Sequence, residues 1–125
     1  MEYRLRLLVI DDDIGVCASV QDAADHLGFD AKSVSDPGKV DEVYRTFQPA
    51  IILLDLVMPK RDGIEILRFL AAEGCEALIA MMSGHGQPII DNAVRLGEAL
   101  GLNLAEPLRK PFRLADLRST LKKVA

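Results

Sequence analysis

The stretch AIILLDLVMPKRDG, residues 50–63, joins five consecutive apolar residues to a carboxylate at Asp55 and then to Pro59. A run that is apolar at every position is typical of a strand buried on both faces, as in a parallel sheet covered by helices. Burial is costly for a charged carboxylate unless other groups compensate the charge. The stretch therefore predicts a buried strand that ends at Asp55 and holds this side chain in a cleft among compensating groups.

Four more apolar runs alternate with segments of helical period along the chain. These runs occupy residues 5–10, 29–34, 77–82 and 102–108. The segments between them repeat apolar residues at the spacing of one helix face, and the last segment does so at Leu114, Leu117, Leu121 and Val124. Three of the segments end at a glycine, which favours helix termination: Gly28, Gly74 and Gly101. Five alternations of strand and helix imply a parallel sheet with helices on both faces.

The composition predicts one cytoplasmic domain over residues 1–125, either standing alone or cut from a longer protein. A formal charge of -4 without a large basic cluster argues against direct binding of nucleic acid. No apolar run approaches the roughly 20 residues that cross a bilayer, and the first residues do not resemble a secretion signal. Cys17 and Cys75 have no CxxC neighbour, so we expect structural free thiols.

Polar residues stand at the carboxyl ends of four predicted strands, and these ends meet at the ligand-binding edge of an open parallel sheet. Asp11 and Asp12 follow the first strand, whereas Asp13 is expected to cap the next helix. Clustered carboxylates raise one another's pKa unless a cation relieves them, and hard oxygen ligands beside phosphate favour Mg²⁺. The first and third strands therefore predict a Mg²⁺ site that includes Asp55.

A carboxylate oxygen beside such an ion is a credible nucleophile toward phosphorus. The fourth strand ends at Ser83, and the fifth run leads into Lys110. The Lys110 ammonium can bind one phosphoryl oxygen, and the Ser83 hydroxyl with the Gly84 amide can bind another. The whole edge is thus suited to phosphoryl transfer onto Asp55.

These motifs resemble the receiver domains of two-component response regulators over essentially the whole chain. The resemblance implies a flavodoxin-like (βα)5 fold with strand order 2-1-3-4-5. It also implies that the domain accepts a phosphoryl group from a sensor histidine kinase, a phosphotransfer protein or a small phosphodonor, and then switches the surface around its fourth helix. Such domains are regulatory rather than enzymatic, although they assist their own phosphorylation and dephosphorylation.

The resemblance also implies a role for each site residue. Asp55 would be the phosphorylated residue, and Asp11 and Asp12 the acidic pair that binds Mg²⁺ with the backbone carbonyl of Val57. Ser83 would be the switch hydroxyl, with Gly84 beside it on the phosphate. Lys110 would be the phosphate-pairing lysine, and Lys110-Pro111 would be the family's cis peptide bond. Met58 to Gly63 reads MPKRDG, which matches the family's MPxxDG turn.

The sequence departs from the family at two places. Pro107 stands where members usually carry an aromatic residue, so the usual aromatic rotation is excluded. The spacing of 27 residues from Ser83 to Lys110 is long, which resembles receivers attached to cyclic-di-GMP phosphodiesterase domains and suggests that output. The fourth helix has a wide apolar surface, which either meets a partner or second copy or packs into its own core.

Other functions fit the residues less well. An Asp-nucleophile phosphatase of the haloacid dehalogenase type needs a hydroxyl where this chain has Gly15, and a flavin binder needs a phosphate loop where it has three carboxylates. A pseudo-receiver that binds partners without phosphorylation is the main alternative, although every phosphorylation residue is present. His85 is either a neighbour of the phosphate site or a solvated loop residue.

Overall fold

The structure is a computed structural model that describes residues 4–123, so Val124 of the last predicted helix lies outside them. Its sheet is parallel, with the order β2-β1-β3-β4-β5, which confirms the predicted fold class. The strands are β1 (Arg6–Ile10), β2 (Asp30–Val34), β3 (Ile51–Asp55), β4 (Leu78–Ser83), β5 (Asn103–Leu104) and β6 (Leu108–Arg109).

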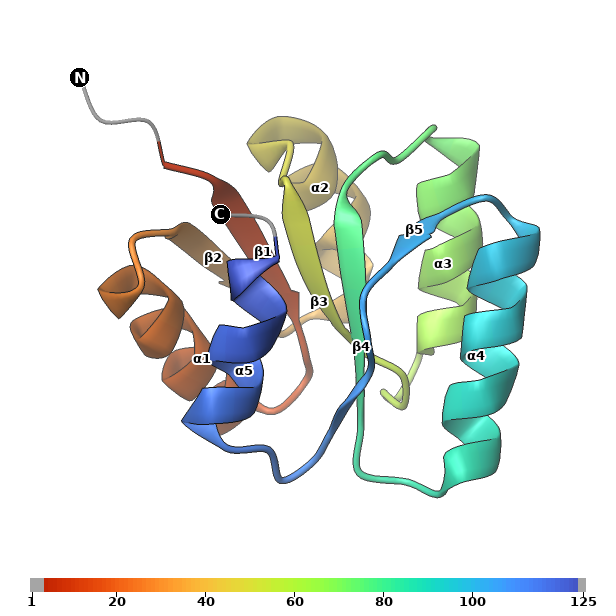
Figure 1. The fold of residues 1–125 in the computed structure, drawn as a ribbon. Coiled ribbons are helices and arrows are strands. Elements are labelled where there is room, and N and C mark those ends of the chain that lie inside the picture. Colours follow the sequence, from red (N-terminus) through yellow and green to blue (C-terminus); the bar gives the residue numbers. More distant parts are fainter. Residues whose placement is uncertain (1–3, 124–125) are drawn as a thin grey trace.

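Helices cover both faces of the sheet (Figure 1). They are α1 (Ile14–His26), the short 3-10 helix η1 (Pro37–Lys39), α2 (Val40–Phe47), α3 (Gly63–Ala72), α4 (Gln87–Ala99) and α5 (Leu114–Lys122). One apolar cluster joins the sheet to α1 and α5, and the other joins it to α2, α3 and α4. Within residues 4–123, no helix is long and apolar enough to span a membrane.

The buried strand β3 explains the continuous apolar run of the sequence. Residues 51–54 are each 0% exposed, and they alternate between the two clusters because successive side chains point to opposite faces. Ile52 and Leu54 pack toward α2, α3 and α4, whereas Ile51 and Leu53 pack toward α1 and α5. A rigid, fully buried strand therefore delivers Asp55 to the edge of the sheet.

The helix ends follow the local signals of the sequence. Asp13 caps α1 as predicted, because its Oδ1 accepts the N–H groups of Gly15 at 2.9 Å and Val16 at 3.2 Å. The three predicted terminating glycines all have positive φ, at 93° for Gly28, 70° for Gly74 and 76° for Gly101. Glycine adopts this left-handed conformation without the steric cost of a Cβ atom.

The fifth predicted strand is interrupted. β5 pairs with Leu78 and Ile79, and β6 pairs with Met82 and Ser83, so together they occupy the place of residues 102–108. Pro107 lies between them and has no N–H with which to continue the ladder. The edge of the sheet therefore consists of two short strands, which pair one after the other with β4.

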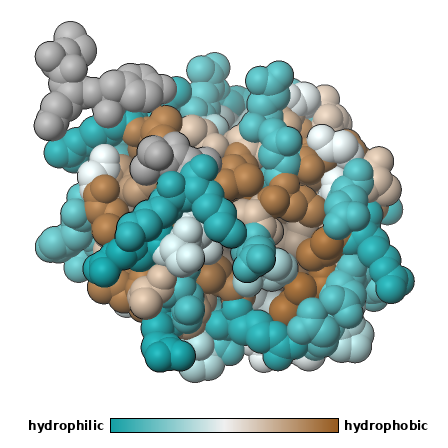
Figure 2. Space-filling model, viewed as in Figure 1, coloured by the Kyte–Doolittle hydropathy of each residue, from teal (hydrophilic) through white to brown (hydrophobic). Residues whose placement is uncertain are grey.

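The apolar surface of α4 is directed mainly into its own core. Ile90, Ala93 and Gly97 are buried, and Val94, Leu96 and Leu100 pack partly against the cluster beneath them. Ile89 is the large apolar residue of this helix that stays exposed, at 38%. Figure 2, seen from the same side as Figure 1, shows apolar residues between hydrophilic ones on the side of the molecule where β5 and α4 lie.

Candidate functional site

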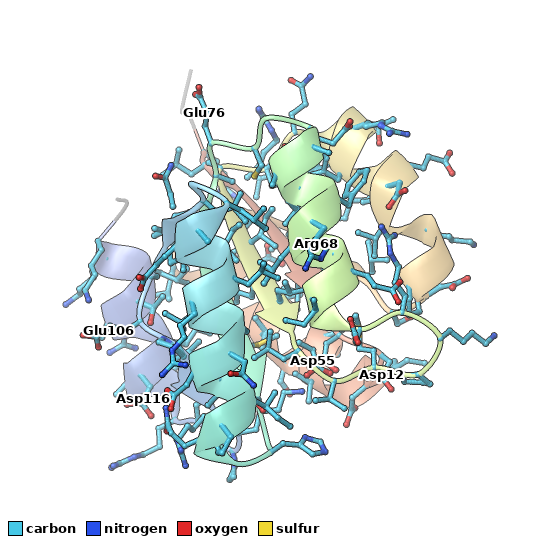
Figure 3. All side chains as sticks on the ribbon, turned by 90° about the vertical axis from the view of Figure 1, so that its right-hand side faces the viewer. Asp12, Asp55, Arg68, Glu76, Glu106 and Asp116 are labelled. Carbon is cyan, nitrogen blue, oxygen red and sulfur yellow. The ribbon has the colours of Figure 1, made fainter. Side chains whose placement is uncertain are left out.

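The predicted site residues meet at the carboxyl edge of the sheet. Asp11 follows β1 and is 0% exposed, Asp55 ends β3 at 5%, and Ser83 ends β4 at 2%. Asp12 is exposed at the same edge, and Figure 3 shows it close to Asp55. Lys110 follows β6, with 21% of its side chain exposed. The structure thus brings together residues that are up to 99 positions apart in the chain.

Lys110 joins two of the carboxylates. Its Nζ lies 2.5 Å from Asp11 Oδ2 and 3.5 Å from Asp55 Oδ1. Its main-chain N–H donates to the Ser83 carbonyl at 2.8 Å, and its bond to Pro111 is cis, as the resemblance implied. Lys110 is therefore attached to three strand ends, with Asp11 as its nearest charged partner.

Every polar atom of Asp11 takes part in a hydrogen bond. Its Oδ1 accepts the Asp13 N–H at 2.9 Å, and its Oδ2 accepts from Lys110. On the main chain, its N–H donates to the Val34 carbonyl at 3.2 Å and its carbonyl accepts from the Cys17 thiol at 3.1 Å. Because these bonds use both carboxylate oxygens, Asp12 and Asp55 are freer than Asp11 to contact an ion directly.

The three carboxylates are spaced for a shared cation. One oxygen each of Asp11, Asp12 and Asp55 lies within 4.8 Å of the others. Among the described residues, no hydrogen bond occupies the Val57 carbonyl oxygen. All four donors are hard oxygen ligands, the kind that Mg²⁺ and Ca²⁺ take, so the donor set fits Mg²⁺.

Without a cation, the surroundings of Asp55 disfavour its ionised form. Burial and then the charge of Asp11 raise the pKa of Asp55 to about 7. Lys110 and a 3.3 Å hydrogen bond from the Val57 N–H act in the opposite direction but do not outweigh them. Burial lowers the pKa of Lys110, yet its hydrogen bond to Asp11 and the charge of Asp55 leave that pKa raised. The site therefore favours any positive charge that relieves Asp55.

The turn after β3 depends on glycine. A Cβ atom at Gly63 would lie 2.7 Å from the Leu56 Cα atom, closer than real Cβ contacts. The Gly63 N–H donates to the Leu56 carbonyl at 3.0 Å, and Asp62 caps α3 through the Glu65 N–H at 3.0 Å. The MPKRDG segment thus returns the chain tightly from Asp55 into α3.

The loop after β4 is open to solvent. The Ser83 Oγ accepts the His85 N–H at 3.0 Å, and Gly84, His85 and Gly86 are exposed. Its far end is tied to the edge strand, because the Arg109 guanidinium donates to the Gln87 side chain at the start of α4. Backbone change in this loop would therefore reach α4 directly.

An apolar surface beside the acidic site was missed in the sequence analysis. Ile14 is 73% exposed at the first position of α1, and Leu114 is 52% exposed at the first position of α5. Between α1 and the segment that joins β6 to α5 lies a groove of about 600 Å³ lined by Asp13, Gly15, Val16, Ser19, Val20, Lys110, Pro111 and Phe112. The sequence could have indicated this surface, because Ile14 directly follows the capping residue Asp13, at an exposed helix start where a polar residue is more common.

Curated proteins similar to this chain are response regulators. The "Response regulator MprA" of Mycolicibacterium vanbaalenii is 25% identical over 118 residues, which cover 94% of this chain and 49% of that protein. The protein of the same name from Mycobacterium ulcerans is 26% identical over 118 residues, which again cover 94% of this chain and 49% of that protein. The chain therefore spans about half the length of these relatives.

Solved structures of receivers superpose closely on the fold. A response regulator from Colwellia psychrerythraea has a TM-score of 0.82 at 26% identity, covering 98% of this chain and 97% of that one. The chemotaxis protein CheY4 of Vibrio cholerae has a TM-score of 0.82 at 21% identity, covering 98% and 100%, and agrees in fold. A family model described as "Response regulator receiver domain" matches residues 7–122. The chain therefore belongs to the receiver domains of two-component response regulators.

Proposed function

We propose that this receiver accepts a phosphoryl group on Asp55 in a Mg²⁺-dependent reaction. The donor is a phosphohistidine on a sensor histidine kinase or phosphotransfer protein, or a small phosphodonor such as acetyl phosphate. The observation that carries the proposal is the placement of Asp55, a buried carboxylate at the end of β3 with Asp12 and Lys110 beside it. Asp11 has the same neighbours, but both of its carboxylate oxygens already accept hydrogen bonds, from the Asp13 N–H and from Lys110.

The chain's own residues supply the geometry of the transfer. A carboxylate oxygen of Asp55 forms a bond to phosphorus while the bond from phosphorus to the donor breaks, and the donor keeps that electron pair. Lys110 can turn from Asp11 toward the transferred group, and the Ser83 hydroxyl and Gly84 N–H can bind another of its oxygens. Asp11, Asp12, Asp55 and the Val57 carbonyl would hold Mg²⁺, which would neutralise charge at the site during the transfer.

Because the pKa of Asp55 is raised, a proton competes with the metal ion and with the phosphoryl group for its carboxylate. With its pKa raised to about 7 by burial and the charge of Asp11, Asp55 in the metal-free protein takes up a proton far more readily than an ordinary aspartate. The ionised fraction grows as pH rises, and a bound cation would lower the raised pKa of Asp55. Metal binding and phosphoryl transfer are therefore both favoured above neutrality.

The experiment that tests the function measures labelling by acetyl phosphate with and without Mg²⁺. We expect close to one phosphoryl group per chain with Mg²⁺, little without it, and a tenfold or larger rise in the Mg²⁺ needed after Asp12→Ala, because a direct carboxylate ligand is lost. Intact-protein mass spectrometry measures the stoichiometry. A protein that folds and stays unlabelled would instead be a pseudo-receiver, the alternative function.

The apolar surface around Ile14 supports a protein donor. It lies beside the acidic site, and an exposed apolar patch next to a reaction centre fits docking of the protein that carries the phosphohistidine. The cyclic-di-GMP output stays a prediction, because it would act through a domain outside this chain.

Ile14→Asp should slow transfer from the cognate kinase or phosphotransfer protein about tenfold to a hundredfold, the loss typical of a buried interface anchor. Labelling by acetyl phosphate should change less than twofold, because the small donor needs no docking surface. Rapid-quench transfer assays with both donors measure the difference. Ile89→Asp is the matched control, since Ile89 is an exposed apolar residue on α4. Equal slowing with both donors would show damage to the site instead.

A further inference from the structure

The β3–α3 loop, residues 56–62, carries the Val57 carbonyl that the proposed function assigns to the metal. In its first half, the Leu56 and Met58 side chains pack in the core at 3% and 6% exposed, whereas Val57 between them is 37% exposed. Its second half lacks such burial, since Pro59, Lys60 and Asp62 are exposed. Lys60 also has a φ of 72°, a left-handed conformation that costs about 1–2 kcal/mol outside glycine. The Gly63–Leu56 hydrogen bond and the Asp62 cap close the end of the loop, and a side chain that reaches another element would hold this half further.

Arg61 provides that attachment. Its Nη1 lies 2.5 Å from Asp41 Oδ1 on α2 and donates to the Pro37 carbonyl of η1 at 3.4 Å. Its guanidinium lies over the Phe69 ring of α3, 5.4 Å from the ring centroid. Only 20% of the side chain is exposed, so these contacts are screened less than those of a surface ion pair. One side chain thus joins the loop to three separate elements.

We propose that Arg61 is a positioning residue for the metal and phosphoryl site. By fixing the second half of the loop to α2 and α3, it keeps residues 57–60 in the conformation that presents the Val57 carbonyl beside Asp55. The inference rests on the proposed function for the identity of the ligand, but the attachment itself is independent of it. Figure 3 shows how the loop leads from Asp55 into α3, on the side of the molecule where Asp12 lies.

Arg45 offers a matched control, because it makes the same kinds of contact from a helix instead of from the loop. Its guanidinium lies 5.3 Å from the Phe69 centroid on the same ring, and its Nε is 2.7 Å from Glu73 Oε1. Arg45→Ala therefore removes one ion pair and one cation–π contact without touching residues 56–62, whereas Arg61→Ala also removes the hydrogen bond to the Pro37 carbonyl from a less exposed side chain. If Arg61 only joined α2 to α3, both variants would lose stability, but neither would change Mg²⁺ binding or exchange of the Gly63 amide more than the other.

The experiment compares Mg²⁺ binding and amide exchange in unphosphorylated variants. In Arg61→Ala we expect the Mg²⁺ concentration at half-saturation, followed by NMR shifts around Asp55, to rise about tenfold, the lower end of the effect typical of residues that orient metal ligands. The Gly63 amide, which closes the loop onto Leu56, should exchange at least tenfold faster. Arg61→Lys should recover part of both losses, because lysine keeps the charge for Asp41 but not the planar stacking.

Each outcome separates the inference from the proposed function. Arg61→Ala and Arg45→Ala with equal Mg²⁺ midpoints and equal Gly63 exchange would overturn the inference while leaving phosphorylation of Asp55 intact. A parent protein that binds no Mg²⁺ would overturn the proposed function, and Gly63 exchange would still decide whether Arg61 holds the loop. If Arg61→Ala does not fold, Asp41→Asn serves instead, because it removes the charged partner on α2 and should reproduce part of both effects.

Discussion

Asp55→Asn is expected to abolish labelling by acetyl phosphate, with a loss of at least a hundredfold, because an amide oxygen is a far weaker nucleophile than a carboxylate. The buried end of β3 offers no second carboxylate in the same position. Mass spectrometry of the intact chain and its peptides measures the loss and locates the label. Asp36→Asn is the matched control, since asparagine also serves as a cap there and Asp36 lies outside the site. Undiminished labelling of Asp55→Asn would refute the assignment.

The same variant should be more stable than the parent above neutral pH in the absence of Mg²⁺. The folded-state pKa of Asp55, about 7, lies above the ordinary value of 3.8, so the folded chain holds a proton that the unfolded chain releases. This contribution is fully present below about pH 4 and is lost as pH rises through 7. Asparagine removes the buried charge, for a gain on the order of 2–4 kcal/mol at pH 8. Urea unfolding at pH 5 and pH 8 measures the gain, and saturating Mg²⁺ should reduce it.

Lys110→Ala is expected to accept a phosphoryl group more readily than Asp55→Asn and yet fail to transmit it. The Mg²⁺ ligands stay in place, so labelling continues at a reduced rate. The contact from the phosphoryl group through Lys110 to the edge strand is lost, however. In the parent, the main-chain N–H of Lys110 donates to the Ser83 carbonyl, and the guanidinium of the neighbouring Arg109 donates to the Gln87 side chain. Both bonds stay in Lys110→Ala, but the side chain that would join them to the phosphoryl group is gone. Lys110 thus connects the site with the first turn of α4.

NMR spectra with and without a beryllofluoride mimic measure this prediction. In the parent, we expect the largest shifts in residues 84–90, where Gly84 and Gly86 permit backbone change, and little movement at Pro107, whose ring fixes its φ. Lys110→Ala should lose most of these shifts, whereas Lys122→Ala, an exposed lysine on α5, should keep them. Parent shifts centred on β5 and β6, with residues 84–90 silent, would contradict this path.

Local patterns in the sequence were sufficient to predict the alternation of strands and helices and the residues that meet at the site, whereas the strand order came from the resemblance to receiver domains. The apolar run before Asp55 predicts a strand buried on both faces, and Asp13 and Gly28 mark where α1 begins and ends. These features depend on backbone geometry within a few residues. Side chains repeat their direction every 2 residues in a strand and every 3.6 residues in a helix, so the pattern of apolar residues reveals both. The rule that strand ends share one edge then brings Ser83 and Lys110 together without any knowledge of distances.

Only the tertiary structure decided how these residues interact. It places Lys110 nearer to Asp11 than to Asp55, raises the pKa of Asp55 to about 7, and leaves Ile14 exposed. It also attaches Arg61 to Asp41, 20 positions away. Coulomb and desolvation energies change steeply over a few ångströms, and those distances are set by packing between segments remote in the chain. The sequence by itself therefore determined which groups share the site, and the packing of distant segments determined their charges and partners.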